Sequence, residues 1–146
     1  MDIDETPKPR WRAEAMAALA ARWIAELRSG AEPRDGDAGA AVTFMNFFAP
    51  ADVQWAFLQA AVELAETEEE FCAIAAGPFE HLLGHHGDAY IDAVERLCAQ
   101  EPKWQRVAEG SWRYMMSDAV WARVQAIQAR GRASSPDAEA DRGTPG

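Results

Sequence analysis

Cysteine, long apolar runs and strand-like segments are scarce or missing in this sequence of 146 residues. Its two cysteines, Cys72 and Cys98, form neither a CxxC pair nor a disulfide framework, and both lie among apolar neighbours that predict buried thiols. No stretch approaches the roughly 20 apolar residues of a membrane span. No segment rich in Val, Ile or Thr alternates with polar residues as a strand would. These absences predict an all-α domain that contacts no membrane.

The start of the chain also lacks the features of an export signal. Residues 1–5 are acidic, whereas a secretory signal needs a basic start, and the apolar run at 15–21 is cut by Arg22. Disulfide frameworks are typical of oxidising compartments, and this chain has none. Together these features predict a cytoplasmic location.

Basic residues are few and unevenly placed. The chain carries 14 Lys and Arg against 24 Asp and Glu, a net charge of −10. Residues 52–101 hold eleven acids and one base, whereas residues 102–132 hold six bases and two acids. A general nucleic-acid binder would need a basic footprint, so we expect no nucleic acid and instead a basic protein partner. The candidate contact residues are Glu68, Glu69 and Glu70 in the acidic part and Trp112, Arg113 and Tyr114 in the basic part.

Apolar residues make up 49% of the chain and recur every three or four positions. This spacing predicts six or seven short-to-medium helices in a compact bundle or a short α-solenoid-like stack. Thr67 and Ser117 have the form of helix N-caps. The segment 43–48 (TFMNFF) is either the lead-in to a helix or a buried extended strip. The expected helices span residues 9–28, 51–65, 68–76, 78–86, 88–100, 102–109 and 118–130.

These helices predict one domain, residues 9–130, between a flexible N-terminus at 1–8 and a disordered tail at 131–146 that is rich in Pro, Gly, Ser and Asp. The Gly- and Asp-rich stretch 30–41 is expected to be a loop. Gly77-Pro78 is expected to end one helix and begin the next, and His86-Gly87 is expected to be a helix stop.

A motif in the middle of the chain is more specific than amphipathic spacing. Residues 75–83 read AAGPFEHLL and are followed by His86-Gly87 and Ile91-Asp92. The motif resembles a family of small bacterial all-helical proteins of unknown function, over about residues 51–124. The resemblance implies a helical fold and no particular activity. An acidic residue often stands at the position of His81 in that family, so the resemblance assigns His81 no shared chemistry. The motif residues are Gly77, Pro78, Glu80, His86, Gly87 and Asp92.

The three histidines are the best chemical candidates. His81 and His85 are four residues apart, so on a helix both rings lie on one face, as the two ligands of a zincin helix do. The glutamate of an HExxH motif is missing and Gly84 weakens the helix between the rings, which favours histidines without a metal. His86 beside Asp92 or Glu95 would suit a general base, although a helix stop explains it more simply. We expect no cofactor.

The leading functional hypothesis is therefore a non-enzymatic protein–protein interaction module, in its most concrete form an immunity- or antitoxin-like binder of a basic partner. One alternative is a metal-dependent or acid–base enzyme that uses His81, His85 and His86. Another is a structural helical adaptor or homodimer.

Overall fold

A computed structural model describes residues 8–134, and it confirms the all-α fold. The described part contains no strand. Its elements are α1 (Lys8–Arg28), α2 (Asp37–Phe48), α3 (Ala51–Leu64), α4 (Glu68–Ile74), the π-helical turn η2 (Ala75–Phe79), α5 (Glu80–Gln100), α6 (Pro102–Glu109) and α7 (Asp118–Ser134).

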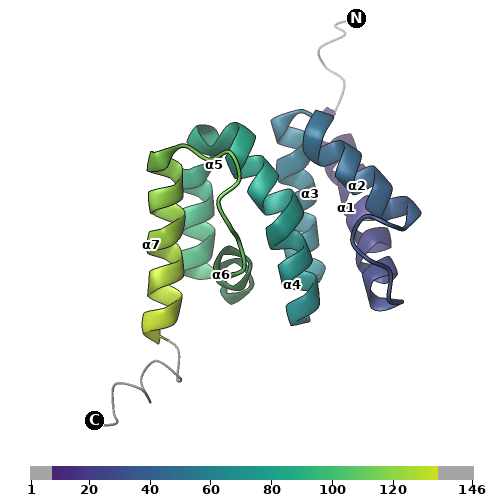
Figure 1. Ribbon diagram of the computed structural model, residues 1–146. Helices are drawn as coiled ribbons and strands as arrows, with labels where there is room; N and C mark the ends of the chain where they lie inside the picture. Colours follow the sequence, from purple (N-terminus) through teal and green to yellow (C-terminus); the bar gives the residue numbers. More distant parts are fainter. Residues whose placement is uncertain (1–7, 135–146) are drawn as a thin grey trace, which may run out of the picture.

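The helices follow one another across the molecule, from α1 and α2 at one end to α7 at the other (Figure 1). α1 packs against α2 and α3, while α7 packs against α5 and α6. The short η2 turn lies between these two ends and contacts α2, α3, α4, α5 and α6. Within residues 8–134, no helix combines the length and the apolar character needed to cross a membrane.

The interface between α1 and α3 buries the apolar stripe of α1. Trp23 is 2% exposed, and its ring centroid lies 5.6 Å from that of Phe57, which is fully buried. Burial of such side chains contributes about 1.5–3 kcal/mol each relative to an exposed position. Leu19 is also buried, as the periodicity predicts, whereas the side chain of Trp11 lies outside the described residues.

The loop prediction for residues 30–41 is wrong for 37–41, which begin α2, and the segment 43–48, left open by the sequence, is the rest of that helix and not an extended strip. The N-terminus of α2 is capped from a distance, because the Glu26 carboxylate of α1 accepts hydrogen bonds from Ala38 N at 2.8 Å and Gly39 N at 2.9 Å. A Cβ at Gly39 would lie 2.5 Å from the Pro33 carbonyl oxygen, so glycine permits the close approach there. A cap supplied by another helix leaves no local sequence signal.

Gly77-Pro78 does not end a helix, contrary to the prediction, whereas the helical geometry is interrupted at His86, where a helix stop was expected. The chain runs from α4 through η2 into α5 without leaving helical geometry, and inside α5 only His86 has non-helical backbone angles, with φ −136° and ψ 26°. α5 bends there and continues. A Cβ at Gly87 would lie 2.9 Å from Val120 Cγ2, so Gly87 allows α7 to pack closely on α5 at the bend.

The last helix begins as predicted and ends later. Ser117 Oγ accepts a hydrogen bond from Val120 N at 3.1 Å, which confirms the N-cap. α7 continues through Gly131 to Ser134, so the prediction of disorder from residue 131 is wrong for 131–134. α7 packs against α6 along this stretch, and the Glu109 carboxylate of α6 lies beside Gly131. The rest of the predicted tail and residues 1–7 lie outside the described residues.

Glu70 joins three helices in place of forming an exposed acidic surface. Thr67 Oγ1 accepts from Glu70 N at 3.2 Å, as the predicted cap requires. The Glu70 carboxylate accepts from Glu66 N at 2.9 Å and from the Arg28 guanidinium at 3.1 Å. Arg28 also donates to the Leu64 carbonyl oxygen at 3.1 Å. Glu70 is 3% exposed, so it belongs to the interior and not to the surface predicted with Glu68 and Glu69.

The Glu70–Arg28 pair predicts a pH-dependent contribution to stability. The hydrogen bond from Arg28 lowers the pKa of Glu70 to about 2 from an ordinary 4.5, so the contribution is complete above pH 4.5 and is lost as the pH falls towards 2. Glu70→Gln should lower the free energy of unfolding at pH 7 by about 1–2 kcal/mol, because Arg28 is half exposed and solvent screens the pair.

Urea unfolding followed by circular dichroism at pH 7, 4 and 2.5 measures this difference. Glu69→Gln is the matched control, since the exposed neighbouring carboxylate should change stability by less than about 0.5 kcal/mol. A stability difference between wild type and Glu70→Gln that stays constant from pH 7 to pH 2.5 would refute the assignment.

Candidate functional site

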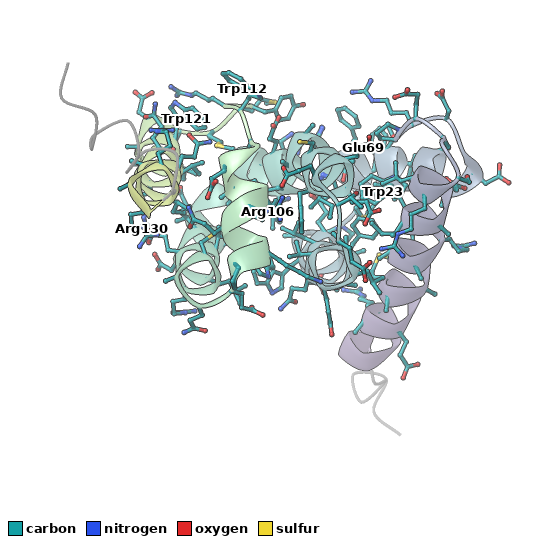
Figure 2. All side chains as sticks on the ribbon, turned by 90° about the horizontal axis from the view of Figure 1, so that it is seen from below. Trp23, Glu69, Arg106, Trp112, Trp121 and Arg130 are labelled. Atoms are coloured by element: carbon teal, nitrogen blue, oxygen red, sulfur yellow. The ribbon has the colours of Figure 1, made fainter. Side chains whose placement is uncertain are left out.

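A cavity of about 360 Å³ lies where α2, the segment 32–35 and the junction of α4, η2 and α5 meet. Its apolar wall includes Trp23, Val42 and Phe47. Figure 2 shows Trp23 directed from α1 towards the neighbouring helices. Three polar side chains of the wall are Thr43, Asn46 and His81, and three charged side chains of the segment 32–35 complete the lining: Glu32, Arg34 and Asp35.

The π-helical turn η2 shapes one side of this cavity through Gly77 and Pro78. Pro78 has no backbone N–H to donate, and a widened turn accommodates it within a continuous helix. A Cβ at Gly77 would lie 3.3 Å from Asn46 Nδ2, so the glycine leaves room for the amide of α2. The Gly-Pro pair of the sequence motif therefore builds the cavity wall.

Two buried polar side chains of the cavity have atoms without a hydrogen-bond partner among the described residues. Asn46 is 5% exposed and His81 is 8% exposed, and neither Asn46 Oδ1 nor His81 Nδ1 has a hydrogen-bond partner among the described residues. Leaving a buried polar atom unsatisfied costs about 1–3 kcal/mol. The neighbouring donors are already committed, because Thr43 Oγ1 donates to the Gly39 carbonyl at 2.9 Å and Trp23 Nε1 to the Pro33 carbonyl at 3.0 Å.

His81 is held between aromatic rings. Its ring centroid lies 4.6 Å from that of Phe47 and 4.5 Å from that of Tyr114. Burial lowers the pKa of His81 below its ordinary 6.5, and the charges of His85 and Arg34 lower it further. The imidazole is therefore neutral at physiological pH, so one ring nitrogen serves as an acceptor.

The structure brings His81 and His85 together without completing a metal site. Their ring centroids are 5.7 Å apart and the rings are nearly perpendicular. Over residues 8–134, no group of three or more His, Cys, Asp or Glu side chains has the arrangement needed to hold a metal ion. The weak metal candidates of the sequence analysis thus lack a third ligand in the described part of the chain.

The acidic residues of the motif serve the fold. Glu80 points to the segment between α6 and α7, where its carboxylate accepts from Trp112 N at 2.8 Å. Burial raises the pKa of Glu80, and the Trp112 hydrogen bond partly opposes that shift. Asp92 and Glu95 both pair with Arg123 of α7. These pairs engage the carboxylates that a general base at His86 would have used.

An exposed apolar surface lies beside the cavity. On α2, Phe44 is 66% exposed, Phe47 50% and Phe48 71%. On the segment between α6 and α7, Trp112 is 76% and Met115 69% exposed, and Trp112 lies at the edge of the molecule in Figure 2. We call these five side chains the apolar surface. His81 lies between its two parts, since its ring contacts Phe47 of α2 and Tyr114, the residue before Met115.

Sequence reasoning missed the α2 half of this surface because residues 43–48 were not assigned to a helix. A usable signal was present, since TFMNFF carries three phenylalanines on a segment too short to bury all of them. As a helix, it buries Val42, Met45 and Asn46 and exposes the phenylalanines.

The segment carrying the other half is held close to α5. A Cβ at Gly84 would overlap the Tyr114 carbonyl oxygen, so glycine permits the contact. Arg113 donates to the Met116 carbonyl at 2.9 Å and pairs with Asp118 at 2.6 Å, which ties the segment to α7. Met115 adopts φ 53°, an uncommon value for a residue other than glycine. Arg113 therefore positions Trp112 and Met115.

The remaining candidates divide between surface and interior. Glu68 and Glu69 are exposed, and Glu68 pairs with Arg106, whose guanidinium lies 4.7 Å from the Phe71 ring centroid. Cys98 is buried as predicted, and burial raises its pKa to about 12. The prediction is wrong for Cys72, which is exposed because it lines an open groove on α4.

The two roles of Glu80, a buried acid and a hydrogen-bond acceptor, predict opposite outcomes for two substitutions. Glu80→Gln keeps an acceptor for Trp112 N and removes the charge that burial disfavours, so stability at pH 7 should stay equal or rise. Glu80→Ala leaves Trp112 N without that acceptor and should cost about 1–3 kcal/mol. Because the folded pKa is raised, wild type should lose stability relative to Glu80→Gln as the pH rises above 4.5.

Thermal and urea unfolding of the two variants between pH 4 and 8 test this assignment. Equal destabilisation by Gln and Ala at pH 7 would show that the charge of Glu80, and not its acceptor oxygen, holds the segment.

The comparisons with known proteins place the chain in a family. No curated protein and no solved structure matches the chain. A family model matches residues 34–132, a wider range than the 51–124 expected from the motif. The match takes in α2, and with it Asn46 and the exposed phenylalanines. The chain belongs to this family of unknown function (DUF6869).

Proposed function

We propose that this protein is a non-enzymatic binding module that docks a basic protein partner on its apolar surface. The observation that carries the proposal is the exposure of five large apolar side chains in two neighbouring segments. Clustered apolar side chains of this size mark interaction sites more often than isolated ones do. Trp and Phe are also typical of the desolvated centre of an interface.

The layout of α2 supports this use. Phe44 and Phe48 are one helical turn apart with ring centroids 4.8 Å apart, so they present one continuous apolar face. The opposite side of α2 already contributes Val42 and Met45 to the core. The three phenylalanines thus take little part in the core of residues 8–134, and their exposed rings are available to a partner.

Charge supports a basic partner. The chain carries a net charge of −10, which steers a positively charged protein towards it. A groove lined by Glu69 and Cys72 shares Glu32, Pro33, Ala73 and Ala76 with the cavity. The groove and the cavity are therefore continuous, with Glu69 at the groove end and Phe47 at the cavity end. In the concrete form that we favour, the protein is an immunity- or antitoxin-like binder acting in a bacterial cytoplasm, where its two unpaired cysteines stay reduced.

A second candidate function is an acid–base enzyme. One observation favours it, namely a neutral, buried His81 lining a cavity. The His81 ring contacts aromatic rings and His85. In general-base sites built on a triad, a carboxylate accepts a hydrogen bond from the imidazole and orients it. His81 has no such hydrogen bond to a carboxylate of the described residues. The binding module therefore accounts for more of the observed features.

Site-specific photo-crosslinking distinguishes the surface from the rest of the molecule. A benzoylphenylalanine at position 48 and, separately, at position 112 should capture the same basic protein in lysate of the organism that makes this chain. Capture should weaken at high salt, because charge speeds the encounter. The matched control is a benzoylphenylalanine at Leu64, an exposed apolar position on α3 outside the apolar surface.

The captured partner is then purified and its affinity measured by calorimetry. Phe44→Ser with Phe48→Ser should weaken binding at least about tenfold while leaving the unfolding temperature unchanged, as expected for hot-spot residues. Equal capture from position 64 would reject the apolar surface as the docking site. Crosslinks only between copies of this chain would reject the module in favour of a homodimer.

A further inference from the structure

We propose that the cavity beside η2 binds the guanidinium group of an arginine side chain, presented by the protein partner that docks on the apolar surface. The biological source of the arginine depends on the proposed function. The site itself can be tested with a small arginine derivative and no partner.

The cavity wall offers acceptor oxygens to a ligand, from the amide of Asn46 and the carboxylates of Glu32 and Asp35. Asn46 Oδ1 and His81 Nδ1 are buried without partners among the described residues, whereas Thr43 Oγ1 and Trp23 Nε1 already donate to backbone carbonyls. A ligand that donates hydrogen bonds would satisfy Asn46 Oδ1, and it would satisfy His81 Nδ1 in the tautomer that carries its proton on Nε2. Guanidinium carries five N–H donors and no acceptor.

The aromatic lining suits a planar cation. Phe47 and Trp23 both line the cavity, and Phe47 is half exposed beside it. A guanidinium stacks on aromatic faces and sheds its weakly held water more readily than an ammonium group does. The volume of about 360 Å³ is at the lower end of small-molecule sites, which hold about 300–1,000 Å³.

The charged side chains that line the cavity carry a net charge of one negative unit, which favours a cationic ligand. Glu32 and Asp35 contribute two carboxylates, Arg34 contributes one positive charge, and His81 is neutral. Removal of Arg34 should therefore strengthen cation binding, and removal of Glu32 should weaken it. An anionic ligand would respond in the opposite sense to both changes.

The position of the cavity connects it to the docking surface. Phe47 lines the cavity and belongs to the apolar surface, and His81 forms part of the cavity wall and contacts Tyr114 beside Met115. A partner that covered the surface would thus bring its own side chains to the mouth of the cavity. An arginine there would supply the positive charge that the acidic chain attracts and a donor for the unpartnered Asn46 Oδ1.

The test uses N-acetyl-arginine methylamide and its neutral isostere N-acetyl-citrulline methylamide. Each is titrated into the full chain while the ring protons of the three histidines are followed by NMR. The arginine derivative should shift the His81 signals saturably with a roughly millimolar dissociation constant, as befits a fragment. The citrulline derivative should bind at least about tenfold more weakly, and the His86 signals should not move.

Two exposed charge variants and one space-filling variant complete the test. Arg34→Gln should tighten binding several-fold and Glu32→Gln should weaken it several-fold. Gly77→Ala should weaken it by placing a methyl group against the Asn46 amide. Equal binding of both derivatives would overturn the choice of a cation, and unshifted His81 signals up to about 100 mM ligand would overturn the site. Neither outcome affects the crosslinking experiment at positions 48 and 112, which tests the proposed function independently of the cavity.

Discussion

The missing backbone N–H of Pro78 is the constraint on which the centre of this molecule depends. A regular α-helix cannot place proline in its interior without losing a hydrogen bond and meeting a clash, so the chain widens into the π-helical turn η2. Glu80 N then bonds back to the carbonyl of Ala75, and the helix continues as α5. The turn is contacted by α2, α3 and α6 as well as by the helices that it joins, and these contacts hold its geometry.

This turn also decides where the chemically interesting side chains go. Phe79 enters the core, Glu80 accepts a hydrogen bond from the segment that carries Trp112, and His81 lines the cavity next to Asn46. Three consecutive residues thus have three different roles. Phe79 packs in the core, Glu80 holds the segment between α6 and α7, and His81 lines the candidate binding site. The wall contains two buried polar atoms that are unpartnered among the described residues, and it lies next to exposed phenylalanines. Features that lower stability in this way are typical of sites where function sets the sequence.

Local patterns predicted much of the fold and little of the site. The stripe through Leu19 and Trp23 and the caps at Thr67 and Ser117 depend on residues a few positions apart, and the structure confirms them. The α2 helix was missed because its capping carboxylate comes from Glu26, on another helix. Glu70 was placed on the surface because its partner, Arg28, lies 42 residues away in the sequence. The cavity was not predicted, since Trp23, Asn46 and His81 come from three different helices.

The sequence by itself determined the all-α class, the acidic character and most of the helix boundaries, because hydrophobic periodicity, caps and charge are local properties of the chain. Only the tertiary structure decided that Gly77-Pro78 continues a helix, that the chain bends at His86 without forming a loop, and that Gly84 and Gly87 are sites of close packing. Glycine and proline interrupt helices in isolation. Contacts from neighbouring helices supply the energy that keeps a widened or bent helix intact, and no local pattern records those contacts.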